Sequence, residues 1–228
     1  MAILALARMT FADGLRQPLT WLAAGLGVAL IALSYLFGMF NFETQDRLRM
    51  LCTAGVAVAV LTSLFLAVVG ASSAIHEELA SRTALTLFAK PISRGQYLIG
   101  KALGIWLVVA LVAVLLAATH GGAVFAAVWT QFEDRPESYG LDNDLWVPWG
   151  RLIGAHLLGL AHSAVLTCIA AVLALRIHLI ANILACFALF ILGHLLPGLE
   201  VTGATLIPAL ALFNVDDSLQ LMQQTLSW

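Results

Sequence analysis

The sequence predicts an all-α integral membrane protein with about five transmembrane helices. Of its residues, 61% are hydrophobic and only 11% are charged, and the mean hydropathy is +0.97. An average soluble domain has roughly 25% charged residues, so this chain has too few charges to cover a water-facing surface. Several apolar stretches are long enough to cross a bilayer. The formal net charge of −2 argues against general nucleic-acid binding.

The five predicted spans are each close to the roughly 20 residues that cross a hydrocarbon core. They cover residues 18–39, 51–73, 103–129, 152–175 and 179–196. The fifth is stopped by Pro197-Gly198. Residues 197–228 are expected to form an extracytoplasmic or re-entrant segment, because the apolar stretch 206–213 contains Pro208 and is too short to span.

Residues 1–17 predict an amphipathic helix that lies in the headgroup plane. Its apolar face, at about 100° per residue, consists of Ile3, Leu4, Ala7, Phe11 and Leu15. Asp13 and Arg16 lie on the other face and Arg8 at the border, so the two arginines are expected to anchor the helix at the interface. The following apolar stretch is too long for a signal-peptide core, and the chain is expected to turn inward at Gln17-Pro18. A frayed tail is the alternative.

The distribution of basic residues predicts a cytoplasmic N-terminus, because cytoplasmic loops are enriched in lysine and arginine. With this orientation the inside segments hold Arg8, Arg16, Arg82, Lys90, Arg94, Lys101 and Arg176. The outside segments hold Arg47, Arg49, Arg135 and Arg151. The loop 130–150 is acidic, and tryptophans at its two ends are typical of a membrane interface. The expected location is the inner or plasma membrane.

The polar stretch 74–102, between the second and third spans, is where the protein could meet a soluble partner. Residues 76–90 predict a short surface helix, with Glu77 and Glu78 near its start, where the helix dipole favours acids. Pro91 ends this helix, and Ser93 can cap the next one. An ordinary solvated loop is the alternative reading of this stretch.

A near-match to a phosphate-binding loop lies in the same stretch. Gly95, Gly100 and Lys101 fit the pattern G-x-x-x-x-G-K, but Ala102 replaces the hydroxyl residue that would hold Mg²⁺. Lys101 also opens an apolar span rather than a soluble helix. Nucleotide binding is therefore not expected here, and Lys101 is instead expected to extend its charged group to the cytoplasmic interface as an anchor.

The run E-x-x-x-R-T-A-L-T-L-F-A-K-P-I-S-R-G-Q-Y-L-I-G-K resembles the signature that follows the second span in type-2 ABC exporter permeases. The matching positions are Glu78, Thr83, Pro91, Ser93, Arg94, Gly100 and Lys101. Arg82 departs from the pattern, since many members have glycine there. The amphipathic start (residues 7–17) and the stretch 206–218 are also similar to the family, in the same order along the chain.

The resemblance implies a permease subunit that pairs with a second copy or a sister subunit. It also implies that residues 74–102 form a coupling segment for a separate ATPase subunit, which would bind the ATP and Mg²⁺. The chain itself is then expected to have no cofactor and no enzymatic activity. The residues expected to couple to the ATPase are Glu77, Glu78, Arg82, Thr83, Pro91, Ser93 and Arg94. Family members usually have a sixth span, so a truncated sequence, or a partner that fills the gap, is expected.

Intramembrane histidines offer an alternative function, because ionisable residues inside a membrane are often functional. His120 and His194 lie toward the same end of their spans and could bind haem or a metal. His156 and His162 are six residues apart on one helix and are not expected to share a ligand. Packing histidines are the simpler interpretation.

Small residues in the fourth span predict close helix packing. Gly150 and Gly154 form a G-x-x-x-G pattern, and Gly159 follows. The sequence leaves open whether they face another helix of this chain or a second subunit. The three cysteines fall inside spans without metal-type spacing and are read as packing residues. Leucine, alanine and valine in the spans do not identify a transported substrate.

Overall fold

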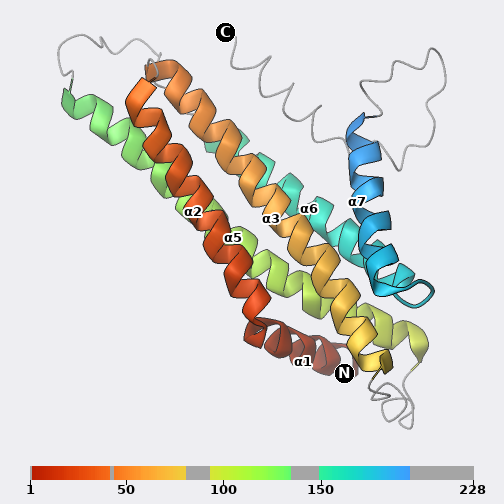
Figure 1. Ribbon diagram of the computed structural model, residues 1–228. Helices are drawn as coiled ribbons and strands as arrows, with labels where there is room; N and C mark the ends of the chain where they lie inside the picture. Colours follow the sequence, from red (N-terminus) through yellow and green to blue (C-terminus); the bar gives the residue numbers. More distant parts are fainter. Residues whose placement is uncertain (1, 42–43, 81–92, 135–148, 196–228) are drawn as a thin grey trace. The chain divides into compact units, whose positions relative to one another are not determined.

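The computed structural model describes residues 2–41, 44–80, 93–134 and 149–195, and this part of the chain is helical (Figure 1). In chain order the helices are α1 (Ala2–Arg16), α2 (Pro18–Asn41), α3 (Thr44–Ala80), α5 (Arg94–Asp134), α6 (Trp149–Leu173) and α7 (Leu179–Leu195). The expected re-entrant segment 197–228 lies outside the described residues.

Four of the described helices are long and apolar enough to cross a membrane. The candidate spans are Pro18–Gly38, Arg47–Glu78, Gly95–Thr130 and Trp149–Leu173, and Leu179–Gly193 is a shorter apolar helix. The predicted fold class, an all-α membrane protein with about five transmembrane helices, is therefore confirmed.

Two helices extend well beyond the spans predicted from hydropathy. Helix α3 continues to Ala80 instead of ending near residue 73. Helix α5 begins at Arg94, before the apolar span 103–129, which agrees with the predicted cap at Ser93. Hydropathy marks only the apolar part of a helix, whereas the backbone hydrogen-bond ladder continues into polar sequence. The first residues of the predicted surface helix 76–90 thus belong to α3, and its remainder lies outside the described residues.

The chain forms two compact units. Unit 1 comprises Met1–Arg16, Leu64–Val109 and Ala161–Trp228, and unit 2 comprises Gln17–Ser63 and Ala110–Leu160. Helix α1 ends at Arg16 and α2 begins at Pro18, as expected from the sequence. Proline is favoured at a first helical position because its missing N–H would have no helical acceptor there.

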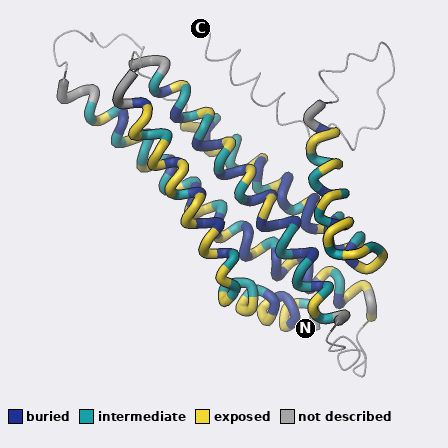
Figure 2. The backbone as a smooth tube through the Cα atoms, viewed as in Figure 1, coloured by how far each residue is buried: buried dark blue, intermediate teal, exposed yellow. Residues whose placement is uncertain are grey.

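In unit 2, helix α2 has one packed face and one exposed apolar face. Ala24 and Ile31 are each only 2% exposed, and at Gly27 an added Cβ would lie 2.8 Å from a methyl group of Leu116. Leu22 and Leu26, by contrast, are 70% and 62% exposed. Figure 2 shows exposed positions recurring along α2. Such an apolar face suits contact with lipid, since exposed apolar side chains are not disfavoured in hydrocarbon.

In unit 1, the core of small and branched side chains consists of Ile75, Ala102, Ala171 and Ala174, with Leu98 packed against it. One buried polar residue, Asn182 of α7, is also part of this unit. Its side-chain amide donates to Ser72 Oγ and to the carbonyl oxygen of Ala170, both at 2.9 Å. These bonds satisfy the amide in an apolar surrounding and connect α7 to α3 and α6.

Candidate functional site

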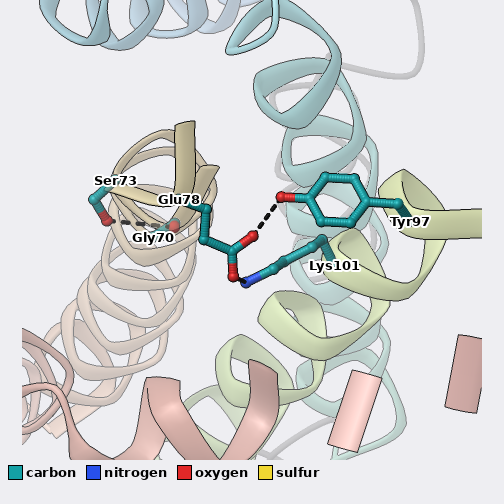
Figure 3. Close-up of polar contacts among 5 residues, drawn as sticks. All are labelled: Gly70, Ser73, Glu78, Tyr97 and Lys101. Atoms are coloured by element: carbon teal, nitrogen blue, oxygen red, sulfur yellow. Dashed lines mark hydrogen bonds and ion pairs between the residues drawn. The ribbon is translucent and has the colours of Figure 1, made fainter. Parts of the chain in front are cut away.

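A cluster of three polar side chains joins the end of α3 to the beginning of α5 in unit 1. Glu78 of α3 accepts a hydrogen bond from the Tyr97 hydroxyl and forms an ion pair with Lys101 Nζ (Figure 3). Tyr97 and Lys101 are four residues apart on α5, so they share one face of that helix. We call Glu78, Tyr97 and Lys101 the α3–α5 polar cluster.

The α3–α5 polar cluster gives Lys101 an internal partner that the sequence did not predict. Its side chain is 6% exposed, and its ammonium group lies against Glu78, whose side chain is 24% exposed. An ammonium group without a nearby carboxylate would be strongly destabilising at this degree of burial. Lys101 is therefore engaged in an internal ion pair, in which Glu78 neutralises its charge, and its role as an interfacial anchor stays a prediction.

The beginning of α5 carries a reciprocal cap. Ser93 Oγ accepts from the backbone N–H of Gln96, and the Gln96 side-chain oxygen accepts from the backbone N–H of Ser93, both at 3.2 Å. This capping box satisfies two backbone donors that the helix leaves without acceptors. The predicted role of Ser93 as a helix cap is confirmed, and the start of α5 is fixed at this residue.

The end of α3 has a second attachment, through His76. The Nδ1 atom of His76 lies 2.9 Å from the carbonyl oxygen of Ser72, and Nε2 lies 3.0 Å from that of Ile177. Ile177 belongs to the connection between α6 and α7. The last turns of α3 are thus connected both to α5, through Glu78, and to the α6–α7 connection, through His76.

The expected coupling residues have different surroundings. Glu77 is exposed on α3, whereas Glu78 belongs to the α3–α5 polar cluster and is paired with Lys101. Glu78, which is expected to pair with the ATPase subunit, forms an ion pair inside this chain instead. Arg94 is the first residue of α5. Arg82, Thr83 and Pro91 lie outside the described residues, as does the side chain of Arg94.

Helix α1 packs on α5 at Gly100 and Gly104, a contact that the sequence did not predict. An added Cβ at Gly104 would lie 2.6 Å from the carbonyl oxygen of Ala7, and one at Gly100 would lie 2.9 Å from a methyl group of Leu6. Gly100 and Gly104 form a G-x-x-x-G pattern on one face of α5. Gly100 therefore serves helix packing within the near-match to a phosphate-binding loop. Arg8 and Arg16 are both exposed on α1.

The glycines predicted to pack in the fourth span behave differently from one another. Gly159 lies against Val60 of α3, where an added Cβ would be 2.6 Å from a methyl group. At Gly150 and Gly154 an added Cβ would meet nothing within 4 Å. Of these three glycines, Gly159 packs against another helix of this chain within the described residues. Packing of Gly150 and Gly154 against a second subunit stays a prediction.

The histidines form a pair that the sequence reading missed. His120 Nδ1 lies 3.0 Å from His156 Nε2, and His120 Nε2 lies 3.1 Å from the carbonyl oxygen of Leu51. These residues come from α5, α6 and α3, and no local spacing in the sequence could have paired them. Both ring nitrogens of His120 are thus engaged. The side chain of His194 lies outside the described residues.

The haem or metal alternative finds no support in the described part of the chain. No group of three or more histidine, cysteine, aspartate or glutamate side chains in that part could hold a metal ion. The His120–His156 pair alone is short of the three or four protein ligands that most metal sites use.

The comparison with known proteins covers nearly all of the described helices. Among curated proteins, no sequence matches this chain. The family model described as ABC-2 family transporter protein matches residues 4–196, which is more than half of the chain. The matched region includes α1, the α3–α5 polar cluster and the predicted coupling segment. The chain therefore belongs to the ABC-2 family of transporter proteins and is a permease of that type.

Proposed function

We propose that this chain is the membrane subunit of an exporter whose ATP is hydrolysed by a separate ATPase subunit. We further propose that the segment between α3 and α5 receives the movement of that ATPase on the cytoplasmic side. A second copy of the chain or a sister permease would complete the transport pathway. ATP and Mg²⁺ would bind to the ATPase and not to this chain.

The α3–α5 polar cluster is the observation that carries the proposal. Glu78 lies two residues before the end of α3, and Lys101 lies in the second turn of α5. Their ion pair joins the two helices on either side of residues 81–92. Because Glu78 contacts both Lys101 and Tyr97, and the Ser93 capping box stabilises the first turn of α5, a push on the intervening segment would move α3 and α5 together.

The proposal assigns different roles to two adjacent glutamates, and this difference can be tested. Glu77 is exposed and available to a partner, whereas Glu78 connects helices inside the chain. We expect Glu77→Arg to lower the amount of ATPase subunit that co-purifies with the chain in mild detergent, by roughly ten-fold. We expect Glu78→Gln to retain the ATPase subunit but to lose the change in ATPase rate that complex formation causes.

Arg49→Glu provides a matched control, because Arg49 is also exposed on α3 but lies near the opposite end of that helix. It should leave both the amount of ATPase subunit and its rate unchanged. The proposal is wrong if Glu77→Arg and Arg49→Glu retain the same amount of ATPase subunit. The assignment of Glu78 is wrong if Glu78→Gln preserves the effect of complex formation on the ATPase rate.

A further inference from the structure

A cavity of about 260 Å³ lies between α5 and α6 in unit 2. Ala113, Ala117 and Gly121 line it from α5 at intervals of four residues, so they form one small-residue face of that helix. From α6 the lining includes apolar side chains such as Leu157 and also the ring of His156. The cavity is therefore apolar, with an imidazole in its wall.

The hydrogen bonds of the histidine pair determine what His156 offers to this cavity. A carbonyl oxygen only accepts, so the bond to Leu51 places the hydrogen of His120 on Nε2. In the neutral ring, Nδ1 of His120 then accepts, and Nε2–H of His156 donates to it. In a neutral His156, Nδ1 is left as an acceptor.

This acceptor has no partner within the described part of the chain. The hydrogen bond of His156 to His120 uses Nε2, and Nδ1 is not among the fully buried atoms that lack a partner. Because His156 lines the cavity, a molecule bound there can approach this acceptor. In hydrocarbon, where water is absent, an unmet acceptor is costly, so a donor that reaches it would be bound selectively.

The cavity is partly open, since Ile153 and Leu157 in its lining are 58% and 61% exposed, so its volume indicates how much of an occupant it can enclose. An apolar cavity of about 150 Å³ is large enough for benzene. On the same scale, a cavity of about 260 Å³ would hold roughly ten non-hydrogen atoms. This is far smaller than a phospholipid and comparable to a medium-chain alcohol.

We propose that this cavity binds a small, uncharged, apolar molecule that carries one hydroxyl group, and that the hydroxyl donates to Nδ1 of His156. The apolar body would pack against the small-residue face of α5, and His120 would act as a positioning residue that fixes the tautomer of His156. The proposal does not depend on the ATPase partner, because binding can be measured on the purified chain alone.

Photolabelling tests this proposal with two molecules of nearly equal shape. The purified chain is labelled with a photoreactive diazirine analogue of octanol, and the labelled peptides are identified by mass spectrometry. Labels should appear on the peptides that contain Ala117 and Leu157. Octanol should compete roughly ten times more effectively than nonane at equal membrane concentration, because only octanol can donate a hydrogen bond to His156.

Variants separate the role of the cavity from that of the histidine. Ala117→Phe fills the cavity and should abolish labelling, whereas Ala118→Phe, at an exposed neighbour outside the lining, should not. His156→Phe should remove the preference for octanol over nonane. Equal competition by octanol and nonane in the wild-type chain would overturn the proposal even if His156→Phe fails to fold. Labelling that persists in Ala117→Phe would also overturn it.

Discussion

Lys101 carries a positive charge on an apolar helix with only 6% of its side chain exposed. Its stability at that place depends on Glu78, which is itself held by the hydroxyl of Tyr97. Removing one member of such a pair leaves the other charge buried without a partner, which is far more destabilising than removing both. The α3–α5 polar cluster is therefore a residue-scale feature whose two charges should be strongly coupled.

Thermal unfolding of the purified chain can measure this coupling. We expect Glu78→Gln to destabilise the protein by about 3–5 kcal/mol, because it leaves the Lys101 ammonium without a carboxylate. The double variant Glu78→Gln/Lys101→Met should recover most of this loss. If the destabilisation of the double variant equals the sum of those of Glu78→Gln and Lys101→Met alone, the two residues are not coupled.

Gly55 is a second residue whose role depends on one neighbour. An added Cβ would lie 2.2 Å from Cδ2 of His120, a ring that is fully buried and held by His156 and Leu51. We expect Gly55→Ala to destabilise the chain by about 1–3 kcal/mol, because the ring cannot move without losing a hydrogen bond. Gly25→Ala is the control in unit 2, since an added Cβ there meets nothing within 4 Å. Equal unfolding temperatures for the two variants would contradict this account.

At the scale of helices, the contact between α1 and α5 depends on Gly104. An added Cβ there meets the backbone oxygen of Ala7, which no side-chain rotation can relieve. We expect Gly104→Leu to displace α1 and to increase the rate of trypsin cleavage after Arg8, which is exposed on α1. Gly95→Leu, where nothing lies within 4 Å of an added Cβ, should leave that rate unchanged. Unaltered cleavage in Gly104→Leu would show that this contact does not hold α1.

The sequence predicted the number and order of the long helices, because a stretch of about 20 apolar residues has few alternatives to a membrane helix. It also predicted the cap at Ser93, which depends on residues three positions apart. The end of α3 lies several residues beyond the predicted span, since hydropathy does not report where a backbone ladder stops in polar sequence.

The contacts between distant residues could not be predicted in the same way. Glu78 and Lys101 lie on opposite sides of a polar segment, and His120 and His156 are 36 residues apart. Nothing in the local periodicity of either helix determines which of its faces will meet the other. For that reason neither the ion pair of Lys101 nor the histidine pair could be predicted from the sequence.

At the scale of the whole molecule, the orientation in the membrane remains a prediction from the distribution of basic residues. In a background without the native cysteines, Asp13→Cys should be protected from a membrane-impermeant thiol reagent in intact cells. Asp13 is exposed on α1, so burial in the protein would not explain such protection. Ser138→Cys, in the acidic loop, should react under the same conditions. Reaction of Asp13→Cys together with protection of Ser138→Cys would reverse the proposed orientation.

The central claim concerns the source of energy: a permease of the ABC-2 family should depend on ATP hydrolysed by another chain. The most direct test is purification of the full chain from its native membranes in mild detergent, followed by quantitative mass spectrometry and an ATPase assay. The account predicts an ABC ATPase in an amount comparable to the chain, and ATP hydrolysis by the complex. Purification of the intact, folded chain with no ATP-hydrolysing subunit and no ATPase activity would contradict it.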